Sequence, residues 1–428
     1  MLNYVENAKD FASFIAESPS CYHAAATGAK RLEDAGFTRQ DERDEWDATA
    51  GGHYIIRDGA LIAYYIPQEA NSSTPFKIIG VHTDSPGLKL KPNPDATSRD
   101  GFNQLGVEVY GGALLNSWID RDLELAGRIT DSEGRTHLVR TGPIMRVPQL
   151  AIHLDRAVNK DGLKLSAQQH MHPVWGIGQE RSILDFVAKR AGLGSAEGIA
   201  GYDLISIDTQ PAGFLGAEGE LMAAPRMDNL VSVHAGLGAL VRAAEQSPSE
   251  ILILAAFDHE EIGSSTRAGA CGPVLEDVLN RTNAALGGNG EQLRRALASS
   301  SCMSSDVGHS VHPNYAERHD PDNRPIMGRG PILKINANQR YTTDAPGEWI
   351  WRTALKQAGV EGQDFVSNND MPCGSTIGPL TATRIGITTF DVGIPILSMH
   401  SARELCHIAD LAKLAAAMQA YYLMTSNL

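Results

Sequence analysis

The sequence predicts a mixed α/β fold, with helices flanking a mixed sheet, that is interrupted by an inserted β-rich domain. Two observations lead to this prediction. Wholly apolar runs, typical of strands buried on both faces of a sheet, accompany helical patterns toward both ends of the chain. Between them, short alternating segments and turn residues replace this pattern. We therefore expect a discontinuous α/β domain, residues 1–90 and 222–428, and an inserted domain, residues 91–221.

The N-terminal part predicts two helices followed by a strand. Residues 5–37 have an apolar helical face, and Ser18-Pro19-Ser20 divides this stretch in two. The apolar residues 76–81 form the expected strand, which ends where loop-forming residues follow. This segment therefore supplies the first piece of the α/β domain.

The middle of the chain predicts a sheet of alternating strands with one helix. The turn residues Asp131-Ser132-Glu133-Gly134 lie between two of the strands and indicate a hairpin. A helical pattern covers residues 182–191. The clearest alternating segments are Val107–Tyr110, Leu123–Thr130 and His137–Arg140.

After residue 228 the α/β pattern returns. Residues 230–244 predict a helix, and residues 251–257 are apolar throughout, which indicates a strand buried on both faces. The chain closes with a helix that has one apolar stripe. Further strands are expected at residues 332–336, 387–390 and 394–399.

Composition excludes several classes of protein. The net charge of −14 argues against binding to nucleic acid or to an anionic membrane, either of which needs a basic face. The longest clean apolar run has seven residues, too few to cross a bilayer, and no secretory signal is expected. Five cysteines without a C-x-x-C pair indicate a reduced, cytoplasmic protein.

Histidine and acidic residues follow the predicted strands or precede a helix. In an open α/β sheet, ligands bind beyond the carboxyl ends of the strands, so these side chains should meet at one edge. Three carboxylates at one edge repel each other unless cations separate them. The residues that we expect to bind metal are His82, Asp228, Glu261, Asp306 and His400.

Two histidines and three carboxylates can hold two divalent ions when one carboxylate bridges them. Each ion then receives one histidine, one carboxylate of its own and the shared carboxylate. Two ions about 3.5–4 Å apart form a known hydrolytic arrangement, although the spacing alone leaves the number of ions open. Imidazole and carboxylate ligands without thiolate suit zinc, cobalt or manganese.

Two further acidic residues have expected roles beside the metals. Glu260 is adjacent to Glu261 and can face the attacking water as a general base. Asp84 lies two residues after His82, where its carboxylate can accept the second imidazole N–H. Simpler explanations also exist, because Glu-Glu pairs are usually solvated and an aspartate before a helix, such as Asp228, is often an N-cap.

The motifs around these residues resemble the aspartyl aminopeptidase family of dinuclear zinc peptidases. The matches occur in order along nearly the whole chain, and every metal position is present. They are Ser18-Pro19-Ser20, Val81-His82-Thr83-Asp84-Ser85-Pro86, Ser117-Trp118-Ile119-Asp120-Arg121-Asp122-Leu123, Leu150-Ala151-Ile152-His153-Leu154, Met227-Asp228-Asn229-Leu230, Asp258-His259-Glu260-Glu261-Ile262-Gly263-Ser264, Ser305-Asp306 with His309, Cys373-Gly374-Ser375-Thr376-Ile377-Gly378-Pro379 and Met399-His400-Ser401-Ala402-Arg403-Glu404.

The resemblance implies a zinc-exopeptidase-like α/β domain and an inserted domain that forms a tetrahedral particle of twelve subunits. It implies that Asp228 bridges the two ions and that Glu260 is the base. It also implies a cis peptide bond after Asp228. The implied ligands are His82, Asp228 and Asp306 for one ion and Asp228, Glu261 and His400 for the other.

The resemblance also implies a preference for peptides with a free N-terminal Asp or Glu. Lys334, and then His309, are the residues expected to meet the acidic side chain, although a strand lysine can instead extend toward solvent. His153 is expected to reach the active site of a neighbouring subunit and stabilise the oxyanion. Its alternative is a core or interface histidine.

The expected function is therefore a metalloaminopeptidase that removes an N-terminal residue, acidic by resemblance, from short peptides. Two alternatives remain open at this point. One is a dinuclear N-acyl amino acid deacylase, which would require a blocked amine. The other is a non-catalytic peptide-binding shell that keeps its metals for folding, against which the additional Glu260 argues.

Overall fold

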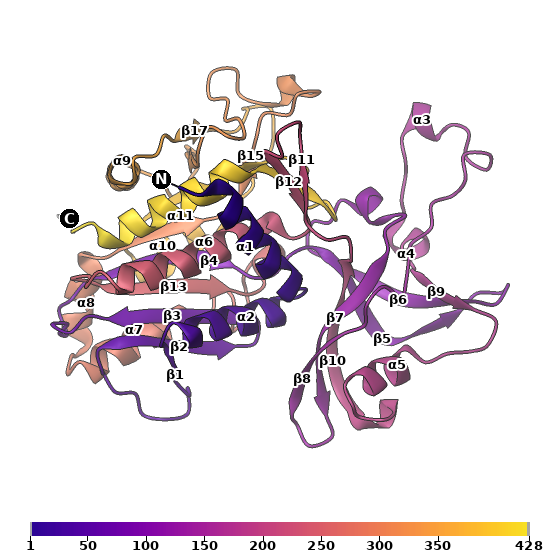
Figure 1. Cartoon of the computed structure of the whole chain (residues 1–428), viewed down its shortest axis with the longest axis horizontal. Coiled ribbons are helices and arrows are strands. Elements are labelled where there is room, and N and C mark those ends of the chain that lie inside the picture. Colours follow the sequence, from indigo (N-terminus) through magenta and orange to yellow (C-terminus); the bar gives the residue numbers. More distant parts are fainter. Residues whose placement is uncertain (1, 426–428) are drawn as a thin grey trace.

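The computed structural model describes residues 2–425 and shows two lobes (Figure 1). One lobe contains a large sheet with helices on both faces. The other contains a smaller sheet built from residues 87–208. We call them the α/β lobe and the inserted lobe. The mixed α/β architecture predicted from the sequence is confirmed.

The sheet of the α/β lobe has nine strands in the order β1-β2-β3-β13-β4-β14-β18-β16-β17. Its centre, from β13 to β18, is parallel, whereas β3 and β16 run antiparallel to their inner neighbours. The strands are β1 (Thr38–Arg39), β2 (Gly51–Arg57), β3 (Ala60–Ile66), β4 (Phe76–His82), β13 (Ile251–Phe257), β14 (Ser301–Ser305), β16 (Ile332–Lys334), β17 (Gln363–Phe365) and β18 (Thr388–Gly393).

Helices cover both faces of this sheet. Successive side chains of a strand point to opposite faces, so Ile79 and Val81 of β4 join one core whereas Phe76 and Ile78 join the other. All seven residues of β4 and of β13 are buried, as expected for strands covered on both sides. The first core includes α1 (Tyr4–Glu17), α2 (Cys21–Asp34), α6 (Met227–Ala244), α9 (Ala345–Ala358) and α11 (Ile408–Leu423), and the second includes α7 (Val274–Ala285), α8 (Gly290–Ala298) and α10 (Ile377–Ile385).

The two N-terminal helices separate where the sequence predicts. Ser18 follows α1, and the Ser20 side chain accepts from the main-chain N–H of His23 to cap α2. The closing helix α11 buries its predicted apolar stripe in the first core. No helix within residues 2–425 combines the length and the hydropathy needed to cross a membrane.

The inserted lobe contains a six-stranded antiparallel sheet in the order β8-β7-β10-β5-β6-β9. The predicted hairpin joins β7 to β8, and the Gly134 N–H donates to the Asp131 carbonyl within its turn. The predicted helix is α5 (Ile183–Arg190), and the lobe also contains the short helices α3 (Val158–Asp161) and α4 (Ala167–His170). The strands are β5 (Gly87–Thr97), β6 (Phe102–Tyr110), β7 (Leu123–Asp131), β8 (Thr136–Arg140), β9 (Val174–Ile177) and β10 (Ile199–Asp208).

Two small sheets complete the α/β lobe. Strand β12 (Leu221–Ala224) pairs with β11 (Gly213–Leu215) on one side and with β20 (Glu404–His407) on the other, and β15 (Gly308–His309) pairs with β19 (Pro395–Ile396). The strand expected at residues 394–399 is wrong in length and place, because only β19 forms and it lies outside the main sheet. Ser398 and His400 have positive φ angles, which end the extended backbone. The 3-10 helices are η1 (Leu115–Trp118), η2 (Ala196–Gly198), η3 (Glu260–Ile262) and η4 (Ala316–Arg318).

Candidate metal centre

The carboxyl ends of three adjacent parallel strands carry most of the candidate metal ligands. His82 is the last residue of β4, Glu261 lies in η3 just after β13, and Asp306 follows β14. Asp228 lies in the first turn of α6, and the peptide bond between Asp228 and Asn229 is cis. His400 lies in the loop before β20. The structure therefore brings these five side chains together from five separate segments.

Asp228 lies between the two histidines. Its Oδ1 is 3.2 Å from His82 Nε2, and its Oδ2 is 3.3 Å from His400 Nε2. Asp306 Oδ1 completes one group at 3.6 Å from His82 Nε2, and Glu261 Oε2 completes the other at 3.3 Å from His400 Nε2. Each group therefore contains one histidine, one carboxylate of its own and a separate oxygen of Asp228.

These residues fit divalent metal ions by two observations. Four of their buried polar atoms have no hydrogen-bond partner among the described residues: His82 Nε2, Asp228 Oδ1, Glu261 Oε1 and Asp306 Oδ1. Buried polar atoms are rarely left without partners, so these atoms are suited to ligate a cation. A tetrahedral ion with ligand bonds of about 2.0–2.1 Å also places two of its ligand atoms about 3.3 Å apart. The distances from each histidine Nε2 to its carboxylate oxygens, 3.2 to 3.6 Å, are close to this value.

Without metal ions, the pKa values of these side chains are shifted because their charges lie so close together. Burial opposes the charged form of His82, but its contacts with Asp228 and Asp306 raise its pKa well above the usual value. Burial raises the pKa of Glu261 strongly, and the neighbouring Asp228 charge adds to this shift. Cations between these groups would relieve the repulsion between the carboxylates.

Glu260 lies beside both groups without completing either of the Asp228 triads. Its Oε2 is 4.0 Å from His82 Nε2, and its side chain is 17% exposed. Burial raises the pKa of Glu260 to about 8, and the Asp306 and Asp228 charges act in the same direction. The carboxylate therefore has the position and the partial access to solvent that a proton carrier needs.

Asp84 organises the loop that carries the two glutamates. Its Oδ1 accepts from the Glu260 N–H at 3.0 Å, and its Oδ2 accepts from the Glu261 N–H at 3.2 Å. The predicted contact with the imidazole of His82 is longer, 3.4 Å from Oδ1 to Nδ1, and the Asp84 main-chain carbonyl is closer at 3.1 Å. Asp84 thus contacts a residue of each metal group, His82 of one and Glu261 of the other, and the contact with Glu261 was not indicated by the sequence spacing.

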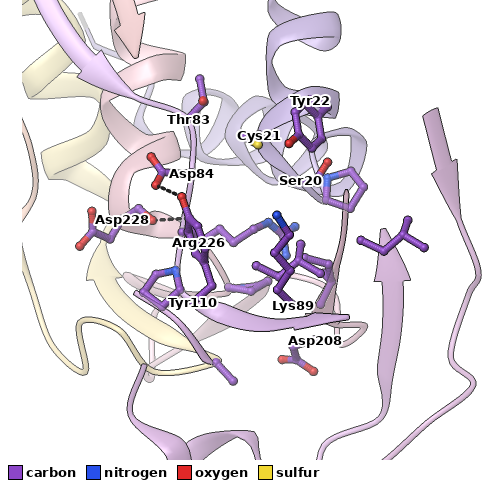
Figure 2. Close-up of a pocket in the computed structure, with 18 of the residues that line it drawn as sticks. Ser20, Cys21, Tyr22, Thr83, Asp84, Lys89, Tyr110, Asp208, Arg226 and Asp228 are labelled. Carbon is purple, nitrogen blue, oxygen red and sulfur yellow. Dashed lines mark hydrogen bonds between the residues drawn. The ribbon is translucent and has the colours of Figure 1, made fainter. Parts of the chain in front are cut away.

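Two positioning contacts were missed by the sequence analysis. The buried Glu404 side chain accepts from the main-chain N–H groups of Asp228 and His400, both at 3.0 Å. The Tyr110 hydroxyl donates to Asp84 Oδ2 at 2.7 Å, a contact drawn as a dashed line in Figure 2. The position of Glu404 four residues after His400 was the available signal, whereas nothing local in the sequence links Tyr110 to this site.

Lys334 and His309 lie near the Asp306 side of the centre. Lys334 is 2% exposed, donates from Nζ to the Val307 carbonyl at 2.8 Å, and lies 5.4 Å from the centre of the Tyr341 ring. Tyr341 and His309 line a cavity of about 310 Å³. His309 thus lines this cavity, and the Lys334 ammonium lies next to Tyr341, another of its lining residues.

His153 is not brought to the metal groups within the described chain. It lies in an exposed loop of the inserted lobe just before α3, a segment that projects away from the α/β lobe (Figure 1). Any contact of His153 with a metal centre would therefore have to involve another copy of the chain.

The α/β fold, with histidine and carboxylate groups collected at its strand ends, is that of a metal-dependent aminopeptidase. The chain belongs to the M18 family, the aminopeptidase I zinc metalloproteases, which its residues 14–422 match. It is 54% identical over 418 residues to the probable M18 family aminopeptidase 2 of Streptomyces avermitilis, with 96% of each chain covered.

Other known proteins agree with this assignment. The probable M18 family aminopeptidase 2 of Mycobacterium leprae is 43% identical over 425 residues, covering 97% of this chain and 98% of that one. The mApe1 chain of the S. cerevisiae mApe1 dodecamer has a TM-score of 0.86 at 27% identity, covering 98% of this chain and 97% of that chain. The family predicted from the motifs is confirmed, and neither the deacylase nor the non-catalytic shell is supported.

Proposed function

We propose that this aminopeptidase binds two zinc ions and removes acidic N-terminal residues from short peptides. The observation that carries the proposal is the pair of three-residue groups that share Asp228, with a separate Asp228 oxygen facing each histidine. His82, Asp228 and Asp306 would hold one ion, and Asp228, Glu261 and His400 would hold the other. Zinc is the metal in the description of the family.

Glu260 is the general base in this proposal. The bound ions would supply Lewis-acid polarisation of the peptide carbonyl and lower the pKa of a water molecule. Glu260, at 4.0 Å from His82 Nε2, takes the proton of the attacking water and delivers it to the leaving amine. Asp84 holds the main-chain N–H of Glu260 at 3.0 Å and so keeps the carboxylate oriented toward the reaction.

The preference for acidic residues is supported by the environment of Lys334. An ammonium group that is 2% exposed is costly unless a negative charge compensates it, and within the described part of the chain no carboxylate pairs with Lys334. A substrate carboxylate provides that charge, and His309 offers a further polar contact at the cavity surface. Lys334 and His309 thus form the acidic specificity site of the proposal.

Replacement of Lys334 tests this assignment. Lys334→Ala is expected to lower kcat/KM for peptides with N-terminal Asp or Glu by about 10- to 100-fold, since a hydrogen bond to a charged group contributes about 1.5–3 kcal/mol. Peptides with N-terminal Leu should change by less than about threefold. Lys413→Ala is the matched control, because Lys413 Nζ also donates to a carbonyl, that of Gly328, at 2.8 Å. Equal loss on acidic and neutral peptides would contradict the assignment.

We also propose that the chain forms a homo-oligomer in which His153 serves the metal centre of a neighbouring subunit. The loop around His153 exposes apolar side chains to an unusual degree: Leu150, Ile152 and Leu154 are 57%, 46% and 75% exposed. Such side chains suit a subunit interface, and the structurally similar S. cerevisiae mApe1 is a dodecamer.

We also propose a cytoplasmic location. The five cysteines are all free, as expected in a reducing compartment.

Mixed oligomers test the role of His153. His153→Phe alone is expected to lower kcat by about 10²- to 10³-fold, the usual effect of losing an oxyanion donor. Co-assembly of His153→Phe chains with Glu260→Gln chains should restore part of the activity, because an intact Glu260 site can then receive His153 from its neighbour. Co-assembly of Glu260→Gln with Asp228→Asn chains, which damage the same site, should restore none. Absence of restoration in the first mixture would rule out the shared site.

A further inference from the structure

One segment of the inserted lobe contacts the metal centre of its own chain. It comprises residues 110–117, which run from the last residue of β6 into η1, and we call it the β6–η1 segment. The Tyr110 hydroxyl donates to Asp84 Oδ2 at 2.7 Å, and the Gly112 carbonyl accepts from His400 Nδ1 at 3.1 Å. Further along, the Leu114 N–H donates to the His400 carbonyl at 3.0 Å.

We infer that the β6–η1 segment is a positioning element that sets the orientation of both metal-binding histidines, with Tyr110 acting through Asp84 and Gly112 acting directly on His400. The inference rests on the proposed two-metal function and adds residues to it. It gives the inserted lobe a part in catalysis within its own subunit, separate from the proposed role of His153 in a neighbour.

Tyr110 acts on the His82 side of the centre. The Asp84 carboxylate is 3% exposed and accepts from the Glu260 and Glu261 main-chain N–H groups as well as from Tyr110. The hydroxyl contributes the shortest of these three contacts, and Figure 2 shows it extending from the inserted lobe to Asp84. Without it, Asp84 Oδ2 loses its shortest contact and the buried carboxylate is held only by the two main-chain N–H groups. The loop that carries Glu260 and Glu261 would then be held less firmly. So would the His82 imidazole, whose Nδ1 lies 3.4 Å from Asp84 Oδ1.

Gly112 acts on the His400 side. Its carbonyl accepts from Nδ1, which places the proton there and leaves Nε2 directed at Asp228 Oδ2 and Glu261 Oε2, both at 3.3 Å. The backbone lies so close that a Cβ atom on Gly112 would be 3.0 Å from His400 Nδ1. Gly111 has φ +68°, and a Cβ there would lie 3.1 Å from Glu261 Cβ. Glycine at both positions permits this approach.

The C-terminal end of the β6–η1 segment also binds the loop that carries His400. Ser117 Oγ accepts from the Ala402 N–H at 2.9 Å, so the loop that follows His400 is held at two points, the other being the Leu114 contact. The segment therefore holds His400 by its ring, its carbonyl and its following residues. The His82 and His400 sides respond to different residues of one segment, which makes their effects separable by mutation.

Two variants with matched controls test the inference in the full-length protein. Tyr110→Phe removes one hydroxyl, and its control is Tyr202→Phe, since the Tyr202 hydroxyl donates to the Lys91 carbonyl at 2.8 Å elsewhere in the inserted lobe. Gly112→Ala adds one methyl group, and its control is Gly201→Ala, where a Cβ meets nothing within 4 Å. The readouts are kcat and KM, and calorimetric titration of metal-stripped protein with Zn²⁺ alone.

Tyr110→Phe is expected to lower kcat by about 10- to 100-fold, the usual effect of losing a partner of a ligating residue, with KM within about twofold. Gly112→Ala is expected to weaken one of the two Zn²⁺ equivalents by about 10-fold or more and to leave the other unchanged. The controls should match wild type in both readouts. If Tyr110→Phe does not fold, by circular dichroism, Gly112→Ala and Ser117→Ala are judged by the same Zn²⁺ readout.

Kinetics and Zn²⁺ affinities of the folded variants that equal those of their controls would overturn the inference. This outcome differs from failure of the proposed function. If the proposed function fails, wild type itself binds fewer than two Zn²⁺ ions or shows no preference for acidic N-termini. If only the inference fails, wild type behaves as proposed and the variants behave like their controls.

Discussion

Glu260→Gln should lower kcat by orders of magnitude while both zinc ions stay bound. Glutamine has nearly the shape of glutamate, but its neutral amide cannot take the proton of the attacking water. General base catalysis typically contributes about 10² to 10⁴ to the rate, so kcat should fall by about that factor. Glu260 completes neither of the groups that share Asp228, so the zinc content should remain that of wild type. Steady-state kinetics and elemental analysis on one preparation measure both quantities.

Glu291→Gln is a suitable control for this experiment. Glu291 has a 63% exposed side chain that pairs with Arg295 on α8, so the same chemical change at that position should leave both kcat and zinc content unaltered. A Glu260→Gln variant that turns over peptides at the wild-type rate would remove the base from the proposed mechanism.

Asp228→Asn should prevent the protein from binding either ion, whereas Asp306→Asn should prevent it from binding only one. Asp228 presents Oδ1 to His82 and Oδ2 to His400, and an amide replaces one of these oxygens and removes the charge. Asp306 approaches only the His82 side, at 3.6 Å. Metal ligation requires the deprotonated carboxylate, so each loss follows the number of groups to which the residue belongs.

Zinc content after reconstitution separates these outcomes. Wild type should hold two ions per chain, Asp306→Asn about one, and Asp228→Asn fewer than one, and activity should be lost in both variants. If Asp228→Asn retained two ions with wild-type affinity, Asp228 could not be the shared ligand. The thermal unfolding of the metal-stripped proteins should be compared as well, so that loss of metal is distinguished from loss of fold.

The central strands could be predicted from the sequence because burial on both faces leaves a local signal. β4 and β13 are apolar along nearly their whole length, and their ends therefore located His82 and Glu261. The hairpin of β2 and β3 was not predicted, although Asp58-Gly59 between them is a strong turn signal. Residues 398–399, just before His400, were predicted as the end of a strand, since the apolar Met399 continues past the positive φ angle of Ser398.

The remaining features of the site depend on contacts that no local pattern records. Tyr110 and Asp84 are 26 residues apart in sequence, and Glu404 reaches Asp228 across 176 residues. These contacts exist because the chain leaves the α/β lobe, forms the inserted lobe and returns. Sequence reasoning could name the candidate metal ligands and Asp84, which have distinctive chemistry, but not Tyr110 or Glu404, which contact them from distant segments.

The most direct test of the account is titration of the metal-stripped, full-length protein with zinc while hydrolysis of a peptide with N-terminal Asp is followed. Two equivalents of Zn²⁺ per chain should bind, and full activity should appear only as the second is bound. Full activity with a single ion, or binding of only one ion at saturation, would contradict a centre built around a shared Asp228.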